Sequence, residues 1–201
     1  DGAWVKGLLV EPDGATNLMP YSVPDANWTG PETTRTYNDG VSPTGQSDAT
    51  LVVADATTAE HYTEDNFGHS GGAGRWVWSA HVKAAGYDWA HMTVVHIGDT
   101  GTTSSAYFNM ASKTWTTPAG NLIDDYGHEE LGGGWFRIWV TLATTASCTS
   151  LYPRVSTTEA GTSVYLGDGV SGLYLWGAQL EAGYVPTSYI PTSGASVPRG
   201  A

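Results

Sequence analysis

Aromatic rings and planar polar groups alternate with apolar residues along several short stretches of this sequence. In WFRIWVTLA (135–143), Arg137 and Trp139 occupy one parity, and apolar residues fill the other from Phe136 onward. An indole ring can stack on the C–H face of a sugar, while guanidinium and amide groups can hold its hydroxyl groups in pairs. The parity that carries Arg137 and Trp139 therefore indicates a surface suited to carbohydrate binding.

Four other stretches alternate in the same way, at residues 75–84, 88–98, 105–115 and 173–181. In an antiparallel sheet that covers a core with one face, the apolar parity points inward and the other parity points outward. We expect one outward, ligand-binding row that comprises Trp139, Arg137, His81, Gln179, Tyr107 and Asn109. Trp89, His91 and Lys83 extend this row.

The inward parity supplies the expected core. It comprises Trp76, Trp78, Ala80 and Val82 in one stretch and Phe136, Ile138 and Val140 in another. In LYLWGAQLE (173–181) it comprises Tyr174, Trp176, Ala178 and Leu180, and Gly177 allows a bulge or a close backbone approach. NLIDDYGHEEL (121–131) has polar breaks and leads into three glycines, so we expect a loop there.

The alternating stretches are separated by Gly-rich turns and show no helical periodicity. The chain has 26 glycines and 10 prolines among 201 residues, which is too many for long helices. Many short antiparallel strands in a chain of this size predict an all-β fold, a two-sheet antiparallel β-sandwich of the jelly-roll type. We expect one domain over residues 1–201.

The charge balance excludes several classes of partner. The chain has 20 acidic and 8 basic residues, a formal net charge of −12. This charge repels phosphate backbones and anionic lipids, so we expect neither nucleic acid nor a membrane as partner, whereas neutral glycans are tolerated. No stretch approaches the about 18 apolar residues that span a bilayer. Cys148 is the single cysteine, which excludes an intrachain disulfide and a Cys-x-x-Cys site.

The histidines do not predict a zinc site. His91 and His96 are five residues apart, so on a strand they face opposite sides. His61 and His69 flank EDNFG, which we interpret as a solvated loop and not as a metal centre.

A structural Ca²⁺ ion agrees better with the sequence than zinc does. Oxygen-rich stretches occur at residues 124–130 (DDYGHEE), 167–169 (GDG) and 64–66. None of them has the spacing of a known Ca²⁺ loop, so the ligands of such an ion are unknown.

Two catalytic alternatives stay open at this point. A glycoside hydrolase needs two carboxylates roughly 5–10 Å apart, for which the sequence offers Asp124, Asp125, Glu129 and Glu130. A polysaccharide lyase needs a Tyr/His pair with an arginine, which His81, Tyr107 and Arg137 could supply. The motifs Gly-x-Ser-x-Gly and His-Glu-x-x-His are absent. Because binding surfaces use the same residue types, we interpret the chain as non-catalytic.

Several stretches carry a family resemblance, namely 7–22 (GLLVEPDGATNLMPYS), 76–84 (WVWSAHVKA), 106–115 (AYFNMASKTW), 132–142 (GGGWFRIWVTL) and 173–192 (LYLWGAQLEAGYVPTSYIPT). Through them most of the chain resembles the jelly-roll, concanavalin-A-like domains of bacteriophage tail and fibre proteins, which are akin to carbohydrate-binding modules. The resemblance is specific for the fold and not for the ligand. It implies that residues 183–201 form a C-terminal segment that covers an edge of the sandwich, with Tyr184, Tyr189 and Ile190 burying apolar surface.

We therefore expect a non-catalytic module that binds a polysaccharide or oligosaccharide. The resemblance implies an extracellular or virion-surface location and attachment to a larger viral or enzyme chain. A structural domain of virion assembly is the alternative without a ligand, and the lyase or hydrolase is the alternative with catalysis.

Overall fold

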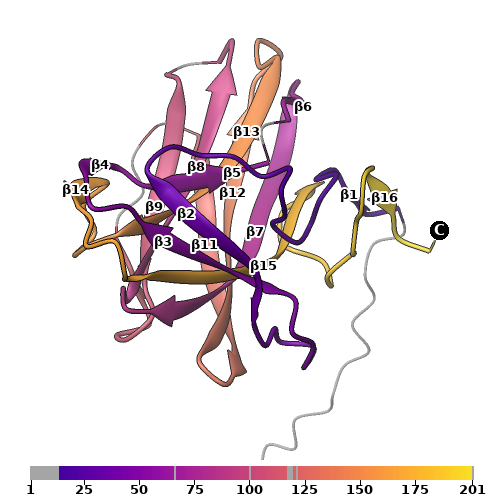
Figure 1. The fold of residues 1–201 in the computed structure, drawn as a ribbon. Coiled ribbons are helices and arrows are strands. Elements are labelled where there is room, and N and C mark those ends of the chain that lie inside the picture. Colours follow the sequence, from indigo (N-terminus) through magenta and orange to yellow (C-terminus); the bar gives the residue numbers. More distant parts are fainter. Residues whose placement is uncertain (1–13, 66, 100, 117–119, 121, 201) are drawn as a thin grey trace, which may run out of the picture.

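A computed structural model describes residues 14–65, 67–99, 101–116, 120 and 122–200 (Figure 1). These residues form sixteen β-strands and no helix. The described part of the chain accordingly contains no helix long and apolar enough to cross a bilayer. Residues 7–13 of the first family-like stretch lie outside the described residues.

Two antiparallel sheets make up the body of the fold. The first, the β8 sheet, has the order β10 (Thr114–Trp115), β9 (Thr103–Asn109), β8 (Trp89–Ile97), β13 (Ser150–Thr158) and β5 (Tyr62–Glu64), with β6 (His69–Ser70) also paired to β13. The second, the β7 sheet, has the order β11 (Ile123–Gly132), β12 (Trp135–Thr144), β7 (Gly74–Ala85), β15 (Gly172–Ala182), β3 (Ala49–Ala54) and β2 (Thr33–Gly40). Two small sheets pair β1 (Thr16–Asn17) with β16 (Val197–Pro198) and β4 (Thr58–Glu60) with β14 (Val164–Leu166).

The connections between the two main sheets give the winding of a jelly roll. The chain passes from β7 in one sheet to β8 in the other, and again from β12 to β13. Strand β7 pairs with β12 in one sheet, and β8 pairs with β13 in the other. The segments β7–β8 and β12–β13 therefore lie side by side in both sheets. This arrangement confirms the predicted all-β sandwich.

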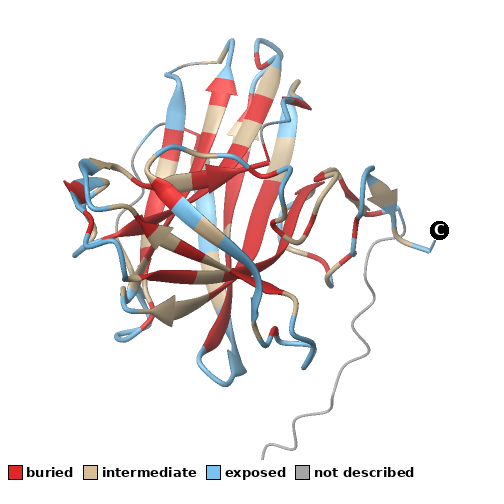
Figure 2. Cartoon of the chain, viewed as in Figure 1, coloured by how far each residue is buried: buried red, intermediate tan, exposed pale blue. Residues whose placement is uncertain are grey.

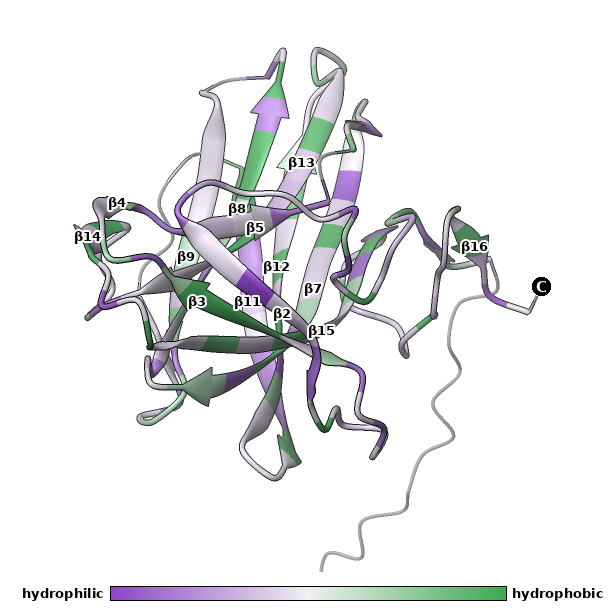
Figure 3. Cartoon of the chain, in the orientation of Figure 1, coloured by the Kyte–Doolittle hydropathy of each residue, from purple (hydrophilic) through white to green (hydrophobic). Residues whose placement is uncertain are grey.

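The core lies between the sheets and follows the predicted alternation. Its members from β7 and β12 are Trp78, Ala80, Val82, Phe136, Ile138, Val140 and Leu142. The β8 sheet contributes Ala90, Met92, Val94, Ala106, Phe108, Leu151 and Val155. Buried bands recur along the strands in Figure 2, and hydrophobic and polar bands alternate along β7 and β13 in Figure 3. Trp76 is only partly buried at the rim of this core.

Strand β15 departs from the predicted parity at Trp176. Its inward residues are Leu173, Leu175, Ala178 and Leu180, so inward positions change from odd to even numbers within the strand. The ladder with β7 is interrupted between Trp176 and Gln179, and Gly177 has a φ of +59°. This bulge turns Trp176 and Tyr174 to the outer face, where Trp176 joins Ala49 and Trp135 in a second apolar cluster.

Residues 123–131 of the segment predicted as a loop belong to strand β11, and residue 121 lies outside the described residues. Strand β11 pairs with β12 along almost its whole length, from Leu142 to Trp135. Because it is an edge strand, its charged side chains stay solvated: Asp124 pairs with Arg75, and Glu130 accepts from Lys113 at 2.6 Å. A polar sequence is compatible with this strand because an edge strand is open to solvent. Its charges also discourage pairing with the strands of other chains.

The bulge at Gly177 provides a stability prediction. A Cβ at this position would lie 2.5 Å from Nδ1 of His81, in a backbone region that strains any L side chain. We expect Gly177→Ala to lower the free energy of unfolding by about 1–2 kcal/mol through the backbone and about 1–3 kcal/mol more through the clash. Gly194→Ala is the matched control. Its φ of +97° is also positive, but no atom of the described residues outside its chain neighbours lies within 4 Å of an added Cβ. Equal losses in urea denaturation would contradict the prediction.

Candidate functional site

The structure divides the expected ligand-binding row between two outer faces. Tyr107, Asn109, Trp89 and His91 lie on the outer face of the β8 sheet. Trp139, Arg137, His81, Gln179 and Lys83 lie on the outer face of the β7 sheet. Strand parity is therefore correct for these residues, but the two groups lie on opposite sides of the core.

The C-terminal segment covers the centre of the β7 sheet's outer face. Nη1 of the Arg137 guanidinium donates to the carbonyl oxygen of Thr187 at 2.6 Å, and Nη2 donates to Oγ of Ser79 at 3.0 Å. The Gln179 side-chain oxygen accepts from the backbone N–H of Ile190 at 2.8 Å. Arg137 is 7% exposed and Gln179 is fully buried, so neither is available to a ligand as expected from the sequence.

Glu181 fixes this segment with a buried carboxylate. One oxygen accepts from the Gln179 amide at 2.7 Å and from the Thr187 backbone N–H at 2.9 Å. The other accepts from the Thr187 hydroxyl at 2.7 Å. Glu181 has no exposed surface, and charge-assisted bonds of this kind are among the strong ones in proteins. Because Gln179 and Glu181 are both buried in these hydrogen bonds, Gln179 is not available to contact a ligand.

His81 is a buried structural residue and not an outward ligand contact. Its ring lies against Trp176 and Tyr189, with centroid distances of 5.0 and 5.9 Å, and its Nδ1–H donates to the carbonyl oxygen of Gly177 at 3.0 Å. Burial, with the nearby positive charge of Arg137 as a smaller cause, lowers the pKa of His81 to about 4. His81 is therefore neutral at neutral pH.

Trp139 and Lys83 keep part of their surface in solvent. The Trp139 indole lies over the glycine of β11 at position 127, where a Cβ would overlap it. Because Arg137, His81 and Gln179 on the same face are buried and bonded within the protein, they cannot serve as the polar partners that were expected to orient a sugar beside this indole.

The C-terminal segment lies on a face of the sandwich and not along an edge. Its contacts are with the central strands β12, β7 and β15. Ile190 is buried, as expected, but Tyr184 is 70% exposed. The Arg75 guanidinium carbon lies 5.0 Å from the centroid of the Tyr184 ring, so this ring contacts a cation instead of entering the apolar cluster.

The outer face of the β8 sheet has a different character. One cross-strand row joins Tyr107, His91, Ser156 and Tyr62 across β9, β8, β13 and β5. The rings of Tyr107 and His91 are stacked, with centroids 3.9 Å apart and planes 7° apart. One face of the Tyr107 ring is thus covered by the imidazole, and the residue as a whole is partly exposed.

The adjacent row carries the charged groups of this face. It joins Ser105, Thr93, Arg154 and Glu64. Nε of Arg154 donates to Oε2 of Glu64 at 2.5 Å, and the guanidinium lies 4.3 Å from the ring centroid of Tyr62. Arg154 and Tyr62 are both partly exposed, so this cluster presents an aromatic ring and planar hydrogen-bonding groups to solvent.

Two further rows extend the face in both directions along the strands. Asn109, Trp89 and Thr158 form the row at one end, and Thr103, Val95 and Tyr152 form the row at the other. Val95 lies six positions after Trp89 on β8, which corresponds to about 20 Å of strand. We call the outward-facing side chains of these rows the β8 face: Tyr62, Trp89, Asn109, Tyr107, His91, Arg154, Glu64 and Tyr152. Of these, His91 and Glu64 are buried and the others are partly exposed.

Buried polar atoms without a partner lie in the middle of the β8 face. Nδ1 of His91 and Oγ of Ser156 have no hydrogen-bond partner among the described residues, and the two residues are cross-strand neighbours. His91 is 3% exposed, and burial lowers its pKa to about 4, so the ring is neutral near pH 7. A buried polar group without a partner costs about 1–3 kcal/mol, which water or a ligand hydroxyl would offset.

Four residues of the β8 face were not predicted from the sequence: Tyr62, Glu64, Arg154 and Tyr152. The segments YTE and SLYPRVSTT do alternate in the required way. Strand β5 is only three residues long, and Pro153 argues against a central strand, which hid the signal.

The two histidines that we did not assign to zinc, and Asp168 of one stretch considered for Ca²⁺, make other interactions. Asn66, from another of these stretches, lies outside the described residues. His61 lies between β4 and β5 and His69 lies on β6, and both are buried instead of lying in a solvated loop. His61 is bonded to the carbonyl oxygens of Glu32 and Tyr165. Asp168 accepts from the N–H groups of Val170 and Ser171 and from the Ser171 hydroxyl. Within the described ranges, no group of three His, Cys, Asp or Glu residues could hold a metal ion.

The proposed catalytic sets are not assembled either. His81 and Tyr107 lie on different sheets, so the lyase combination with Arg137 is divided by the core. The carboxylates of the hydrolase alternative, Asp124, Asp125, Glu129 and Glu130, are all exposed on the edge strand β11.

Comparison with models of known protein families gives no match, and comparison with curated proteins gives none either. Among solved structures, the chain is similar to the CBM22-1–GH10 modules of endo-1,4-β-D-xylanase 10B from Clostridium thermocellum, solved in complex with xylohexaose. The TM-score is 0.47 and the sequence identity is 13%, over 89% of this chain and 30% of that one. This chain thus spans less than a third of that structure, and a likeness of this degree does not bear on the site.

Proposed function

We propose that this protein is a non-catalytic module that binds a neutral polysaccharide on the β8 face. The observation that carries the proposal is the cross-strand arrangement of Tyr107, His91, Arg154 and Tyr62 on two adjacent rows. Partly exposed rings alternate there with planar polar groups, on a sheet face where Nδ1 of His91 and Oγ of Ser156 have no hydrogen-bond partner among the described residues.

Each group has a defined role in this proposal. The Tyr107 ring, held flat by its stacking on His91, contacts the C–H face of a sugar. Arg154, held by Glu64 and Tyr62, donates hydrogen bonds to a pair of hydroxyl groups. Trp89 and Asn109 on one side and Tyr152 on the other extend these contacts to neighbouring sugar units.

The net charge selects the kind of polymer. With a formal charge of −12, the chain repels uronate-bearing and sulfated polysaccharides at low salt. The positive charge of Arg154 is already paired with Glu64 and does not reverse this preference. We therefore propose neutral polysaccharides as the ligand class.

We further propose that the module belongs to a larger surface protein, on a virion or outside a cell. Its resemblance to tail and fibre domains of bacteriophages supports this context. A single shallow face gives weak binding, and display of several copies on one assembly raises the avidity.

Affinity electrophoresis in gels with neutral polysaccharides tests the proposal. We expect at least one neutral gel to retard the wild type, and we expect Tyr107→Ala to weaken that binding about tenfold, a loss of about 1.4 kcal/mol. Trp139→Ala is the matched control on the opposite sheet and is expected to bind like the wild type. Failure of every gel to retard the wild type, or equal retardation of wild type and Tyr107→Ala, would contradict the proposal.

A further inference from the structure

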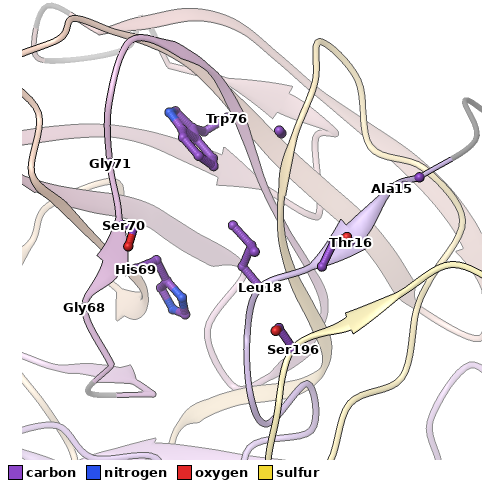
Figure 4. Close-up of a pocket in the computed structure, with 11 residues that line it drawn as sticks. Ala15, Thr16, Leu18, Gly68, His69, Ser70, Gly71, Trp76 and Ser196 are labelled. Carbon is purple, nitrogen blue, oxygen red and sulfur yellow. The ribbon is translucent and has the colours of Figure 1, made fainter. Parts of the chain in front are cut away.

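A pocket of about 540 Å³ lies at the end of the sandwich, apart from the rows of the β8 face (Figure 4). It is lined by Gly14, Ala15, Thr16 and Leu18, by strand β6 with its flanking glycines Gly68 and Gly71, and by Trp76, Ala182 and Ser196. Figure 4 shows Trp76, His69 and Leu18 projecting toward a common space from different elements. Ligand pockets of small molecules have volumes of roughly 300–1,000 Å³, so this one has the size of a binding site.

The wall of the pocket combines one aromatic ring with several hydroxyl groups. The Trp76 indole N–H donates to Oγ1 of Thr144 at 2.9 Å, so the polar edge of this ring is satisfied and its apolar surface is left for contact. Leu18 adds aliphatic surface. Ser70, Thr16 and Ser196 supply hydroxyl groups around the same space.

His69 contributes an oriented acceptor to this pocket. Its Nε2–H donates to Oδ2 of Asp65 at 3.1 Å, and Asp65 is 1% exposed. An imidazole that donates through Nε2 to a carboxylate presents Nδ1 as an acceptor when the ring is neutral. The pocket therefore offers an oriented imidazole nitrogen and hydroxyl groups beside an aromatic wall.

The charge of the lining restricts the ligand. None of the eleven lining residues is Asp, Glu, Lys or Arg. A charged ligand would enter without a counter-charge from these residues, which is costly. A neutral ligand with an apolar face and several hydroxyl groups agrees with all of these features, and a sugar ring has this chemistry.

The pocket also adjoins one end of the β8 face. Gly68 lines the pocket, and a Cβ on Gly68 would lie 2.7 Å from the hydroxyl oxygen of Tyr152. Strand β6 continues the sheet at that point, since His69 pairs with Leu151, the neighbour of Tyr152. The end of the face and the rim of the pocket are thus formed by the same stretch of chain.

From these observations we infer that the pocket is a second saccharide site, which takes the terminal one or two units of a neutral glycan. This inference rests on the proposed function in its ligand class, but it uses different residues. The β8 face is open along the strands and takes internal units of a polymer, whereas the pocket takes a chain end.

The test uses disaccharides of glucose, xylose, mannose and galactose with the full chain, followed by titration calorimetry and NMR of the indole N–H groups. The Trp76 signal is assigned by its loss in Trp76→Phe. We expect one of these disaccharides to bind and to shift the Trp76 signal. Ser70→Trp and Ser196→Trp, which place an indole at two exposed positions on the rim, are each expected to weaken this binding at least tenfold.

Two variants serve as controls. Ala146→Trp adds an indole at an exposed position that does not line the pocket, and it is expected to bind the disaccharide like the wild type. Tyr107→Ala alters the β8 face and is expected to keep the disaccharide affinity within about twofold while it loses retention by the polymer of the same sugar.

The outcomes separate the two proposals. The pocket inference alone is overturned if polymer retention depends on Tyr107 but no disaccharide binds. It is also overturned alone if a disaccharide binds and both rim variants leave that binding intact. The proposal for the β8 face alone is overturned if the rim variants abolish disaccharide binding but Tyr107→Ala leaves polymer retention unchanged. Absence of binding to every disaccharide and polymer overturns both.

Discussion

Trp176→Ala is expected to lower the free energy of unfolding by about 3–5 kcal/mol, the range for removing a buried tryptophan. Trp176 is 4% exposed and packs with Ala49 and Trp135 in the second apolar cluster, against Tyr189 of the C-terminal segment at a centroid distance of 4.4 Å. Its indole N–H has no acceptor among the described residues, so the loss comes from packing. The variant leaves a cavity between the β7 sheet and the segment that covers it.

Urea denaturation of Trp176→Ala measures this loss. Val185→Ala is the control within the same C-terminal segment, because Val185 is 60% exposed, and it is expected to change stability by no more than about 0.5 kcal/mol. A loss below about 1 kcal/mol for Trp176→Ala would mean that the C-terminal segment does not pack on this face as described.

The second large effect is a loss of stability between pH 7 and pH 5. Burial lowers the pKa of both His81 and His91 to about 4, whereas an unfolded histidine titrates near 6.5. As the pH falls below 6.5, the unfolded chain binds protons that the folded protein does not yet bind, so the folded state loses its advantage. We expect a loss of about 2 kcal/mol per histidine at pH 5, or about 4 kcal/mol for the pair.

Urea denaturation at pH 7, 6 and 5 measures this dependence. His91→Phe keeps an aromatic ring beside Tyr107 but cannot titrate, so we expect it to remove about half of the loss between pH 7 and 5. The difference between pH values is the readout, because it does not depend on how far the substitution itself destabilises the fold. A pH dependence identical to that of the wild type would show that His91 does not titrate as a buried group.

Alternation was sufficient to predict the sandwich and most of its core. Phe136, Ile138 and Val140 face inward because adjacent positions of a strand face opposite sides, and only one side of the β7 sheet meets the core. The same rule failed at Trp176, because the bulge at Gly177 changes the parity within the strand. A glycine in a strand indicates that a bulge is possible, but it does not give the direction in which the parity changes.

The site was less predictable, because it depends on contacts between distant residues. Arg137 has the parity of an exposed residue, yet the carbonyl oxygen of Thr187, 50 residues further along the chain, covers it. Alternation reports which side of a strand a residue faces and cannot report what lies on that side. For the same reason Tyr107 and His91 were assigned to a row that the structure divides between two sheets.

The most direct test of the β8 face is an NMR titration of the wild type with the neutral polysaccharide fragment that it binds most tightly. The indole N–H signals report both outer faces at once: Trp89 belongs to the β8 face, Trp139 lies on the opposite sheet, and Trp176 is buried beneath the C-terminal segment. We predict that the Trp89 signal shifts during the titration while the Trp139 and Trp176 signals stay in place. A shift of Trp139 with an unchanged Trp89 would place the glycan on the other sheet and contradict this account.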